Sequence, residues 1–271
     1  MDELHSKYEK LKEYLASLGS VAVAYSAGVD STFLLKTAHD LLKDKVVAVT
    51  AEHGAFPKRE RREAEDFCKK EKIEQIKIRF DEMAVEGFSD NPPERCYLCK
   101  KALFRKIADE AAARGIACVA EGSNLDDEGD YRPGMKAIAE LNIKSPLRAA
   151  KLTKREVRAL SKERGLYTWD KPSYACLATR IPYGETITPE KILMIERSEQ
   201  ALYYLGFRQS RVRHHGSVAR IELEESDLER GMERRAEISK KLKELGFSYV
   251  AIDLEGYQTG SLNVFDKKKT I

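Results

Sequence analysis

Two groups of residues have the types and the spacing that chemistry needs. The first is the stretch SAGVDS, residues 26–31, which follows an apolar run at 21–25. Small residues between a strand and a helix expose several backbone N–H groups at the helix N-terminus, and such a turn attracts anions. Ser26 and Ser31 can donate hydroxyl hydrogen bonds to a phosphate, and Asp30 supplies an oxygen ligand for Mg²⁺. We therefore predict a phosphate-binding turn, and the alternative is an ordinary helix start capped by Asp30 or Ser26.

The second group consists of three cysteines. Cys96 and Cys99 are spaced C-x₂-C at the start of a predicted helix, and Cys176 lies in a polar segment beside Arg180. Three thiolates allow a [4Fe–4S] cluster with one iron open to a non-protein ligand, or a zinc ion with one further His or Asp ligand. They also allow a redox pair, Cys96 with Cys99, that serves Cys176 as the sulfur-bearing residue. Three unrelated cysteines are the remaining alternative. The other two cysteines are predicted to be buried and unreactive: Cys68 and Cys118.

Predicted strands and helices alternate up to about residue 170. The strands are predicted at 21–25, 45–51, 75–80 and 116–121, and the helices at 31–42, 58–71, 97–114 and 152–164, the last with Thr153 as N-cap. This alternation predicts an α/β fold with a doubly wound parallel sheet in a domain spanning 1–170. Helices at 189–205 and 228–245, strands within 211–223 joined by a turn at HHGS, and a strand at 249–254 predict a smaller α+β domain at 171–271.

The composition limits the class of protein. Charged residues make up 34% of the chain but nearly balance at a formal net charge of +3, which argues against a nucleic-acid-wrapping surface. No apolar stretch reaches the roughly 18 residues that a membrane span needs. The N-terminus is charged and lacks the apolar centre of a signal peptide. A cytoplasmic protein is therefore expected, where five cysteines do not form a disulfide framework.

The stretch SAGVDS resembles the S-G-G-x-D-S motif of the ATP-pyrophosphatase, or PP-loop, superfamily, whose members bind the pyrophosphate of ATP. Ala27 stands where the superfamily usually has Gly, which predicts a backbone angle that tolerates a Cβ. The resemblance assigns ATP and Mg²⁺ to this turn, with contacts from Ser26, Ala27, Gly28, Asp30 and Ser31.

Further motifs extend the resemblance over nearly the whole chain: CYLCKKALF, DEGDYRPGMKA, ACLATRIPYGETIT, RVRHHGSVARIEL and YVAIDLEGYQTGSLN. Together they resemble the LarE family of PP-loop sulfur transferases. The resemblance implies that ATP adenylates a carboxylate of pyridinium-3,5-biscarboxylic acid mononucleotide with release of pyrophosphate. Sulfur then displaces AMP to leave a thiocarboxylate, and the cycle repeats on the second carboxylate.

The family carries out the sulfur step in two ways. In one, a cysteine at the position of Cys176 gives up its own sulfur. In the other, three cysteines hold a [4Fe–4S] cluster, and the presence of Cys96, Cys99 and Cys176 implies this type. The source of the sulfide is not implied by any motif. The family also implies a homo-oligomer, a hexamer built as a trimer of dimers.

The resemblance implies roles for several charged residues. Arg180, Arg211 and Arg213 match positions linked to the substrate phosphate, and Arg211 and Arg213 share one face of a predicted strand, as a phosphate clamp requires. Lys101 follows the C-x₂-C pair and can neutralise phosphate or the acyl-adenylate, and Glu199 matches an acidic position near the sulfur-bearing residue. The alternative for each is a solvated surface charge.

Two polar groups are predicted to stay outside the site. His214 and His215 are expected to be exposed on a hairpin turn rather than to bind a metal. The acidic side chains of residues 126–130 are expected at the carboxyl edge of the sheet, as a solvated loop in preference to a Mg²⁺ site: Asp126, Asp127, Glu128 and Asp130.

Three other functions compete with this interpretation. A tRNA-thiolating PP-loop enzyme should carry a strongly basic surface or an RNA-binding module, and the sequence shows neither. A non-catalytic carrier of ATP or of an iron–sulfur cluster would release no pyrophosphate in response to a small acceptor. An amide-forming PP-loop ligase would have no use for the cysteines.

Overall fold

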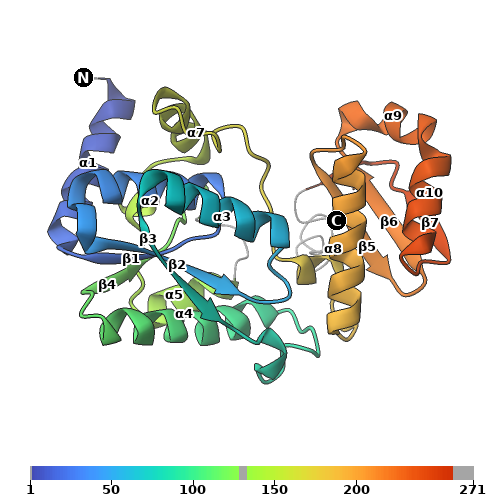
Figure 1. Cartoon of the computed structure of the whole chain (residues 1–271), viewed down its shortest axis with the longest axis horizontal. Helices are drawn as coiled ribbons and strands as arrows, with labels where there is room; N and C mark the ends of the chain where they lie inside the picture. Colours follow the sequence, from blue (N-terminus) through green and yellow to red (C-terminus); the bar gives the residue numbers. More distant parts are fainter. Residues whose placement is uncertain (1, 128–132, 259–271) are drawn as a thin grey trace, which may run out of the picture. The chain divides into compact units, whose positions relative to one another are not determined.

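The computed structural model describes residues 2–127 and 133–258, and the chain forms two compact units (Figure 1). The first unit combines Met1–Val85 with Glu94–Tyr174, and the second combines Glu86–Pro93 with Ala175–Ile271. The short segment Glu86–Pro93 therefore packs with residues that follow it by more than eighty positions in the sequence. Within residues 2–127 and 133–258, no helix is long and apolar enough to cross a membrane.

The first unit is built on a parallel four-stranded sheet of order β3-β2-β1-β4. Its strands are β1 (Val21–Ala24), β2 (Val46–Glu52), β3 (Glu74–Arg79) and β4 (Cys118–Ala120). The chain leaves β1 toward β2 and β3 on one side, and β4 adds to the other side of β1. Open parallel sheets bind ligands at the carboxyl ends of the strands beside such a reversal of strand order, which lies here between β1 and β4.

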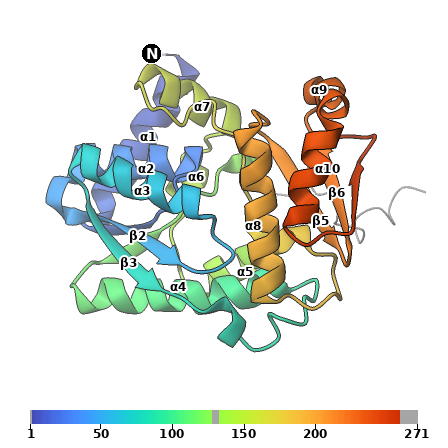
Figure 2. The same cartoon turned by 45° about the vertical axis from the view of Figure 1, so that its right-hand side comes forward.

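Helices cover both faces of this sheet (Figures 1 and 2). Their bounds are α1 (Glu3–Leu18), α2 (Val29–Leu42), α3 (Lys58–Glu71), α4 (Arg95–Ala113), α5 (Pro133–Glu140), α6 (Pro146–Ala149) and α7 (Lys154–Glu163). Val21 and Val23 of β1 pack against α2 through Phe33, and Ala22 faces the opposite side with Phe104 of α4. Alternate residues of one strand thus enter two separate cores, which is why the strands are apolar on both faces.

The second unit holds a three-stranded sheet of order β5-β6-β7. Its elements are α8 (Pro189–Tyr204), β5 (Ser210–His215), β6 (Val218–Leu223), α9 (Leu228–Glu233), α10 (Arg235–Glu244) and β7 (Tyr249–Ile252). β5 and β6 are antiparallel, and β6 and β7 are parallel. Leu202, Phe207, Ile221 and Leu242 meet in its core. The predicted fold class, a parallel α/β sheet with a smaller α+β part, is confirmed.

The prediction of one helix at 228–245 is wrong, because α9 ends at Glu233 and α10 begins at Arg235. The Arg234 guanidinium at the break donates Nη1 to the Leu205 carbonyl oxygen at 2.6 Å. In α9, a Cβ on Gly231 would lie 2.5 Å from Leu223 Cδ1. The absence of a side chain at this position lets α9 pack directly on β6. The segment therefore consists of two short helices and not of one straight helix.

The predicted cap of α7 is confirmed. The Glu156 backbone N–H donates to Thr153 Oγ1 at 3.3 Å, and Glu156 Oε2 accepts from the Thr153 backbone N–H at 2.8 Å. This reciprocal pair satisfies two donors that the helix N-terminus would otherwise leave without a helical partner.

Thr153→Ala should lower the free energy of unfolding of the first unit by about 1 kcal/mol, because it leaves a helix donor without its acceptor. The measurement is urea denaturation followed by fluorescence of Trp169, the one tryptophan of the chain, which lies in this unit. Thr153→Ser keeps the hydroxyl and should stay close to the wild type. Equal losses in both variants would show that the methyl group, and not the cap, stabilises α7.

Candidate functional site

The turn between β1 and α2 has the form expected of an anion site. Gly28 is the N-cap of α2 and makes no side-chain cap hydrogen bond, so the predicted alternative of a cap by Asp30 or Ser26 is wrong. The Ser26 and Ser31 hydroxyl oxygens lie 3.2 Å apart, and Ser31 Oγ donates to the Gly28 carbonyl oxygen at 3.2 Å. Both hydroxyls therefore lie at a helix start whose N-cap residue supplies no side-chain acceptor, in a region of positive helix-dipole potential.

Ala27 in this turn has a φ of +56°. The expectation of a backbone angle that tolerates a Cβ is wrong, since this left-handed region favours glycine. The conformation costs a residue with a Cβ roughly 1–2 kcal/mol. Ala27 is fully buried, and Lys171 Nζ donates to its carbonyl oxygen at 3.0 Å. Tertiary contacts thus hold a turn that the local sequence does not favour.

The loop after β4 closes on the same turn. A Cβ on Gly122 would lie 3.0 Å from the Ser31 backbone nitrogen and 3.2 Å from the Asp30 carbonyl carbon. Asn124 Nδ2 donates to Asp30 Oδ1 at 3.2 Å, and Lys154 Nζ pairs with Asp30 Oδ2. The turn after β1 and the loop after β4 therefore meet at the point where the strand order reverses, the position at which such sheets bind ligands.

Lys171 is a site residue that the sequence analysis missed. Its Nζ is held by Glu60 Oε2 at 2.7 Å and by the Glu63 carboxylate, in addition to the carbonyl oxygen of Ala27. Burial raises the pKa of Glu60 even though the positive charge of Lys171 acts to lower it. A lysine before a proline carries no periodic or motif signal of its own, and only the fold brings its amine to the carbonyl oxygen of Ala27 in the turn.

Cys96 and Cys99 lie in the first turns of α4, as predicted, and both thiols are partly exposed. Their i, i+3 spacing puts the two sulfurs on one face of the helix. Because α4 connects two parallel strands, β3 and β4, it runs antiparallel to them and begins at the carboxyl edge of the sheet. Arg95 is buried and directs Nη2 toward Cys96 Sγ at 3.9 Å.

Lys101 on the same helix is engaged with its neighbours. Its Nζ lies 2.7 Å from the Tyr97 hydroxyl and 2.8 Å from Glu140 Oε2 on α5. The hydrogen bond to Glu140 raises the pKa of Lys101, so its amine is protonated at neutral pH. This state suits a cation that neutralises an anion and does not suit a general base.

The thiols of the other two cysteines are shielded from solvent to different degrees. Burial raises the pKa of the Cys68 thiol to about 12, and it also raises the pKa of Cys118, which is only half-buried.

The described carboxylates of the predicted acidic loop accept hydrogen bonds from the backbone. Asp126 Oδ2 accepts the Lys154 backbone N–H at 2.8 Å, and Asp127 Oδ2 accepts the Asn124 backbone N–H at 2.9 Å. Two further members of the predicted acidic loop lie outside the described residues: Glu128 and Asp130.

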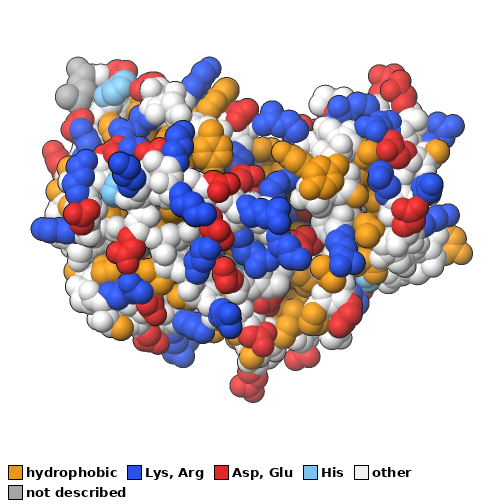
Figure 3. All heavy atoms as spheres, in the orientation of Figure 1, with side chains coloured by type: hydrophobic (Ala, Val, Ile, Leu, Met, Phe, Trp, Pro, Cys, Tyr) orange, Lys and Arg blue, Asp and Glu red, His pale blue; other side chains and the backbone are white. Residues whose placement is uncertain are grey.

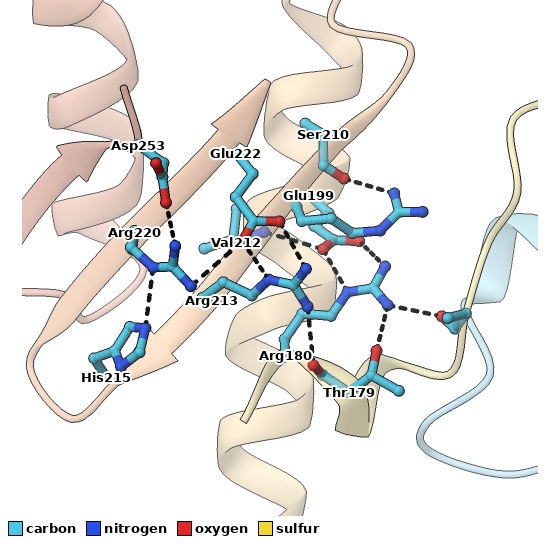
Figure 4. Close-up of polar contacts among 12 residues, drawn as sticks. Thr179, Arg180, Glu199, Ser210, Val212, Arg213, His215, Arg220, Glu222 and Asp253 are labelled. Atoms are coloured by element: carbon cyan, nitrogen blue, oxygen red, sulfur yellow. Dashed lines mark hydrogen bonds and ion pairs between the residues drawn. The ribbon is translucent and has the colours of Figure 1, made fainter. Parts of the chain in front are cut away.

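In the second unit, Cys176 precedes a short 3-10 helix, η4 (Leu177–Arg180). Arg180 of η4 forms a two-point ion pair with Glu199 of α8, through Nε to Oε1 at 2.8 Å and Nη2 to Oε2 at 3.0 Å (Figure 4). Burial alone would raise the pKa of Glu199, but the charge of Arg180 and its hydrogen bonds hold that pKa below its ordinary value. Glu199 is therefore ionised at neutral pH and is unsuited to act as a general acid.

Arg211 and Arg213 lie two residues apart on β5, as the clamp prediction requires, but both are buried. Arg213 pairs with Glu222 of β6 through Nε at 2.9 Å and Nη2 at 2.6 Å (Figure 4). The Arg211 guanidinium lies 5.0 Å from the centre of the Tyr257 ring, and its Nη1 donates to the Ser210 carbonyl oxygen at 2.8 Å. These arginines are ordered within the protein, which excludes the alternative of solvated surface charges.

The expectation that both histidines are exposed on the hairpin turn is wrong. They belong to β5, and the turn consists of Gly216 and Ser217. The His214 ring is buried, 5.5 Å from the Phe247 ring centre, and Arg220 Nε lies 3.2 Å from His215 Nε2. Burial lowers the pKa of both histidines, so both are neutral at pH 7.

Asn91 is a second residue that the sequence analysis missed. It is fully buried with a φ of +55°, a conformation that asparagine tolerates better than most residues. Its Nδ2 donates to the carbonyl oxygens of Ile181, Pro182 and Glu185 at 3.3, 2.6 and 3.1 Å. Asn91 thereby fastens the loop that follows η4 to the segment Glu86–Pro93. An asparagine before two prolines signals a turn, but not which loop the turn will hold.

Cys96 and Cys99 belong to the first unit and Cys176 to the second. Within either unit, the described residues hold no group of three or more His, Cys, Asp or Glu side chains arranged for a metal ion. A cluster on all three cysteines stays a prediction.

On the face drawn in Figure 3, acidic and basic side chains are interspersed, in keeping with the small net charge.

Comparison with known proteins identifies the family. No protein-family model matches the chain. Over 264 residues it is 36% identical to the pyridinium-3,5-bisthiocarboxylic acid mononucleotide synthase of Lactiplantibacillus plantarum, covering 97% of this chain and 96% of the synthase. The chain belongs to the LarE family. The family predicted from the motifs is thus confirmed, and with it an enzyme of the sulfur transferase class.

Two uncharacterized proteins are also similar to this LarE-family chain. One, from Synechocystis sp., is 40% identical over 262 residues and covers 96% of this chain and 98% of its own length. The other, from Methanocaldococcus jannaschii, is 31% identical over 239 residues, which are 88% of this chain and 91% of that protein. The similarity therefore extends through both units.

Lys171→Met should destabilise the first unit by about 3–5 kcal/mol, because it leaves the buried Glu60 carboxylate without its main cation. Urea denaturation followed by Trp169 fluorescence measures the loss. The double variant with Glu60→Gln should recover part of it, and Lys69→Met, the same change at an exposed position of α3, should cost less than about 0.5 kcal/mol. A loss in Lys171→Met no larger than in Lys69→Met would contradict the buried ion pair.

Proposed function

We propose that this LarE-family chain is an ATP-dependent sulfur transferase that converts the carboxylates of pyridinium-3,5-biscarboxylic acid mononucleotide into thiocarboxylates. The observation that carries the proposal is the near full-length similarity to a synthase whose name states the bisthiocarboxylic acid product. The turn between β1 and α2 supports the use of ATP, because its two serine hydroxyls lie at a helix start without a side-chain cap, where backbone N–H groups can bind phosphate. The turn also lies at the strand-order reversal, where the loop after β4 comes within contact distance of it.

The proposed first step is adenylation. A substrate carboxylate oxygen bonds to the α-phosphorus of ATP, and the bond to the β-phosphate oxygen breaks, which releases pyrophosphate. The backbone N–H groups at the start of α2 and the hydroxyls of Ser26 and Ser31 bind the departing pyrophosphate. Asp30 would hold Mg²⁺, which would supply positive charge against the phosphates. Its carboxylate already lies beside Lys154 and Asn124, which orient it.

The proposed second step is displacement of AMP by sulfur at the activated carbonyl carbon, which breaks the bond to the AMP oxygen and leaves a thiocarboxylate. Lys101 is protonated and is suited to neutralise the anionic adenylate. Of the two arginines of the predicted clamp, Arg211 is the one suited to bind the substrate phosphate, because Nε and Nη2 of Arg213 are already taken by Glu222. Cys96 and Cys99 share one helix face and would hold two positions of a thiolate-ligated cluster, and Cys176 would supply the third thiolate. A [4Fe–4S] cluster with an open iron would carry the sulfide that these thiolates alone do not renew.

Asp30→Ala should weaken Mg²⁺–ATP use by about tenfold to a hundredfold, because it removes a charged oxygen ligand. The measurement is pyrophosphate release as a function of ATP concentration, with the pyridinium nucleotide as acceptor. Asp40→Ala removes a carboxylate from the far end of the same helix and should leave this release unchanged. Wild-type release in Asp30→Ala would remove Asp30 from the nucleotide site.

Wild-type protein reconstituted without oxygen should contain about four irons per chain, and Cys96→Ala, Cys99→Ala and Cys176→Ala should each lose them. The Cys96 and Cys99 variants should also lose repeated turnover while keeping ATP binding. Cys118→Ala, a thiol on β4, should keep both iron and turnover. A wild type without iron that loses the mass of one sulfur at Cys176 during reaction would establish a sacrificial cysteine instead.

A further inference from the structure

Arg180 is fully buried, and its guanidinium faces in two directions. One edge, Nε and Nη2, is occupied by the Glu199 carboxylate (Figure 4). In the other direction, Nη1 donates to the backbone carbonyl oxygens of Ala175 at 2.9 Å and of Cys176 at 3.2 Å. The same nitrogen lies 2.9 Å from Thr179 Oγ1. The flat edge that arginine normally presents to a phosphate is therefore taken by a carboxylate of the protein.

The Cys176 carbonyl oxygen is held from several sides. It accepts the Thr179 backbone N–H at 3.0 Å and the Thr179 hydroxyl at 2.8 Å, in addition to Arg180. Arg213 Nη1 donates to the Thr179 carbonyl oxygen at 2.9 Å, and this arginine is itself fixed by Glu222. The backbone at Cys176 is thus tied to a network of charged groups and not only to its chain neighbours.

Glu199 extends this network to the sheet. Its Oε1 accepts the Val212 backbone N–H of β5 at 3.1 Å as well as Arg180 Nε. Glu199 lies on α8, so one carboxylate connects η4, α8 and β5. Val212 lies between Arg211 and Arg213, and the network therefore fixes the backbone of the thiol-bearing loop with respect to the strand that carries both arginines.

We propose that Arg180 and Glu199 are positioning residues, which hold the backbone of Cys176 in one place relative to β5 and do not contact the substrate. The inference rests on the proposed function in one respect, that Cys176 takes part in sulfur transfer. It differs from the role that the family resemblance implies for Arg180, which is contact with the substrate phosphate. Misplacement of a reacting group by about 1 Å lowers a rate roughly 100-fold, so such a pair can be essential without touching the reacting atoms.

The first test does not depend on activity. Arg180→Lys keeps the charge but loses the two-point contact, and Glu199→Gln keeps the shape but loses the charge. In both variants, hydrogen exchange of the Thr179 amide, which donates to Cys176, should become at least about tenfold faster, while amides of β6 serve as the reference for global unfolding. Glu237→Gln removes the carboxylate from a separate arginine pair of the same unit, with Arg234, and should leave the Thr179 amide unchanged. Unchanged exchange in both Arg180→Lys and Glu199→Gln would overturn the proposal.

The second test separates positioning from substrate contact. With pyridinium-3,5-biscarboxylic acid mononucleotide as substrate, positioning predicts a thiocarboxylate-forming kcat lower by roughly 100-fold and a KM changed by less than about twofold. A KM raised more than about tenfold in Arg180→Lys, with kcat retained, would show that Arg180 binds the substrate and would overturn the proposal. If the wild type forms no thiocarboxylate, the proposed function fails, and the exchange measurement alone then decides whether the pair positions Cys176.

Discussion

The first unit depends on one sharp bend, the turn between β1 and α2. Its left-handed residue, Ala27, and its N-cap, Gly28, leave the start of α2 without a side-chain cap. An uncapped helix start is costly unless other groups or a ligand satisfy it. The surrounding chain is arranged around this turn: Gly122 touches it from the β4 side, and Lys171 binds a carbonyl oxygen within it. The turn is thus held in a conformation that is locally unfavourable, at the place where we propose that a phosphate binds.

In the second unit, two arginine–glutamate ion pairs fix the backbone around Cys176. The Arg180–Glu199 and Arg213–Glu222 pairs both use two-point geometry, and Arg180, Arg213 and Glu222 are buried. Pairs of this kind add little net stability, because desolvation offsets their attraction. What they do provide is direction, since a guanidinium that is held along one edge can donate from the other only at fixed angles. In the first pair, the remaining nitrogen of Arg180 donates to the carbonyl oxygens of Ala175 and Cys176, and in the second pair that of Arg213 donates to the carbonyl oxygen of Thr179 in η4.

The turn between β1 and α2 and the ion pairs near Cys176 meet different needs of the proposed sulfur transfer. Binding a phosphate needs backbone N–H groups that are left open, which short-range sequence can specify with small residues. Holding a thiol at a set place needs groups from several elements that agree on one geometry, which requires a core with charged groups inside it.

From the residues alone we could predict the family, the parallel α/β sheet, the cap at Thr153 and the helical position of Cys96 and Cys99. These features depend on periodicity, caps and motifs that extend over a few residues. The conformation of Ala27, the break at Arg234 and the partners of the buried charges depend on packing and could not be predicted in this way. The reason is distance along the chain: Glu60 lies 111 residues from Lys171, and Glu199 lies 19 from Arg180. The residue type of a charged side chain does not indicate whether it will contact solvent, a ligand or another side chain, because its partner depends on how distant segments pack.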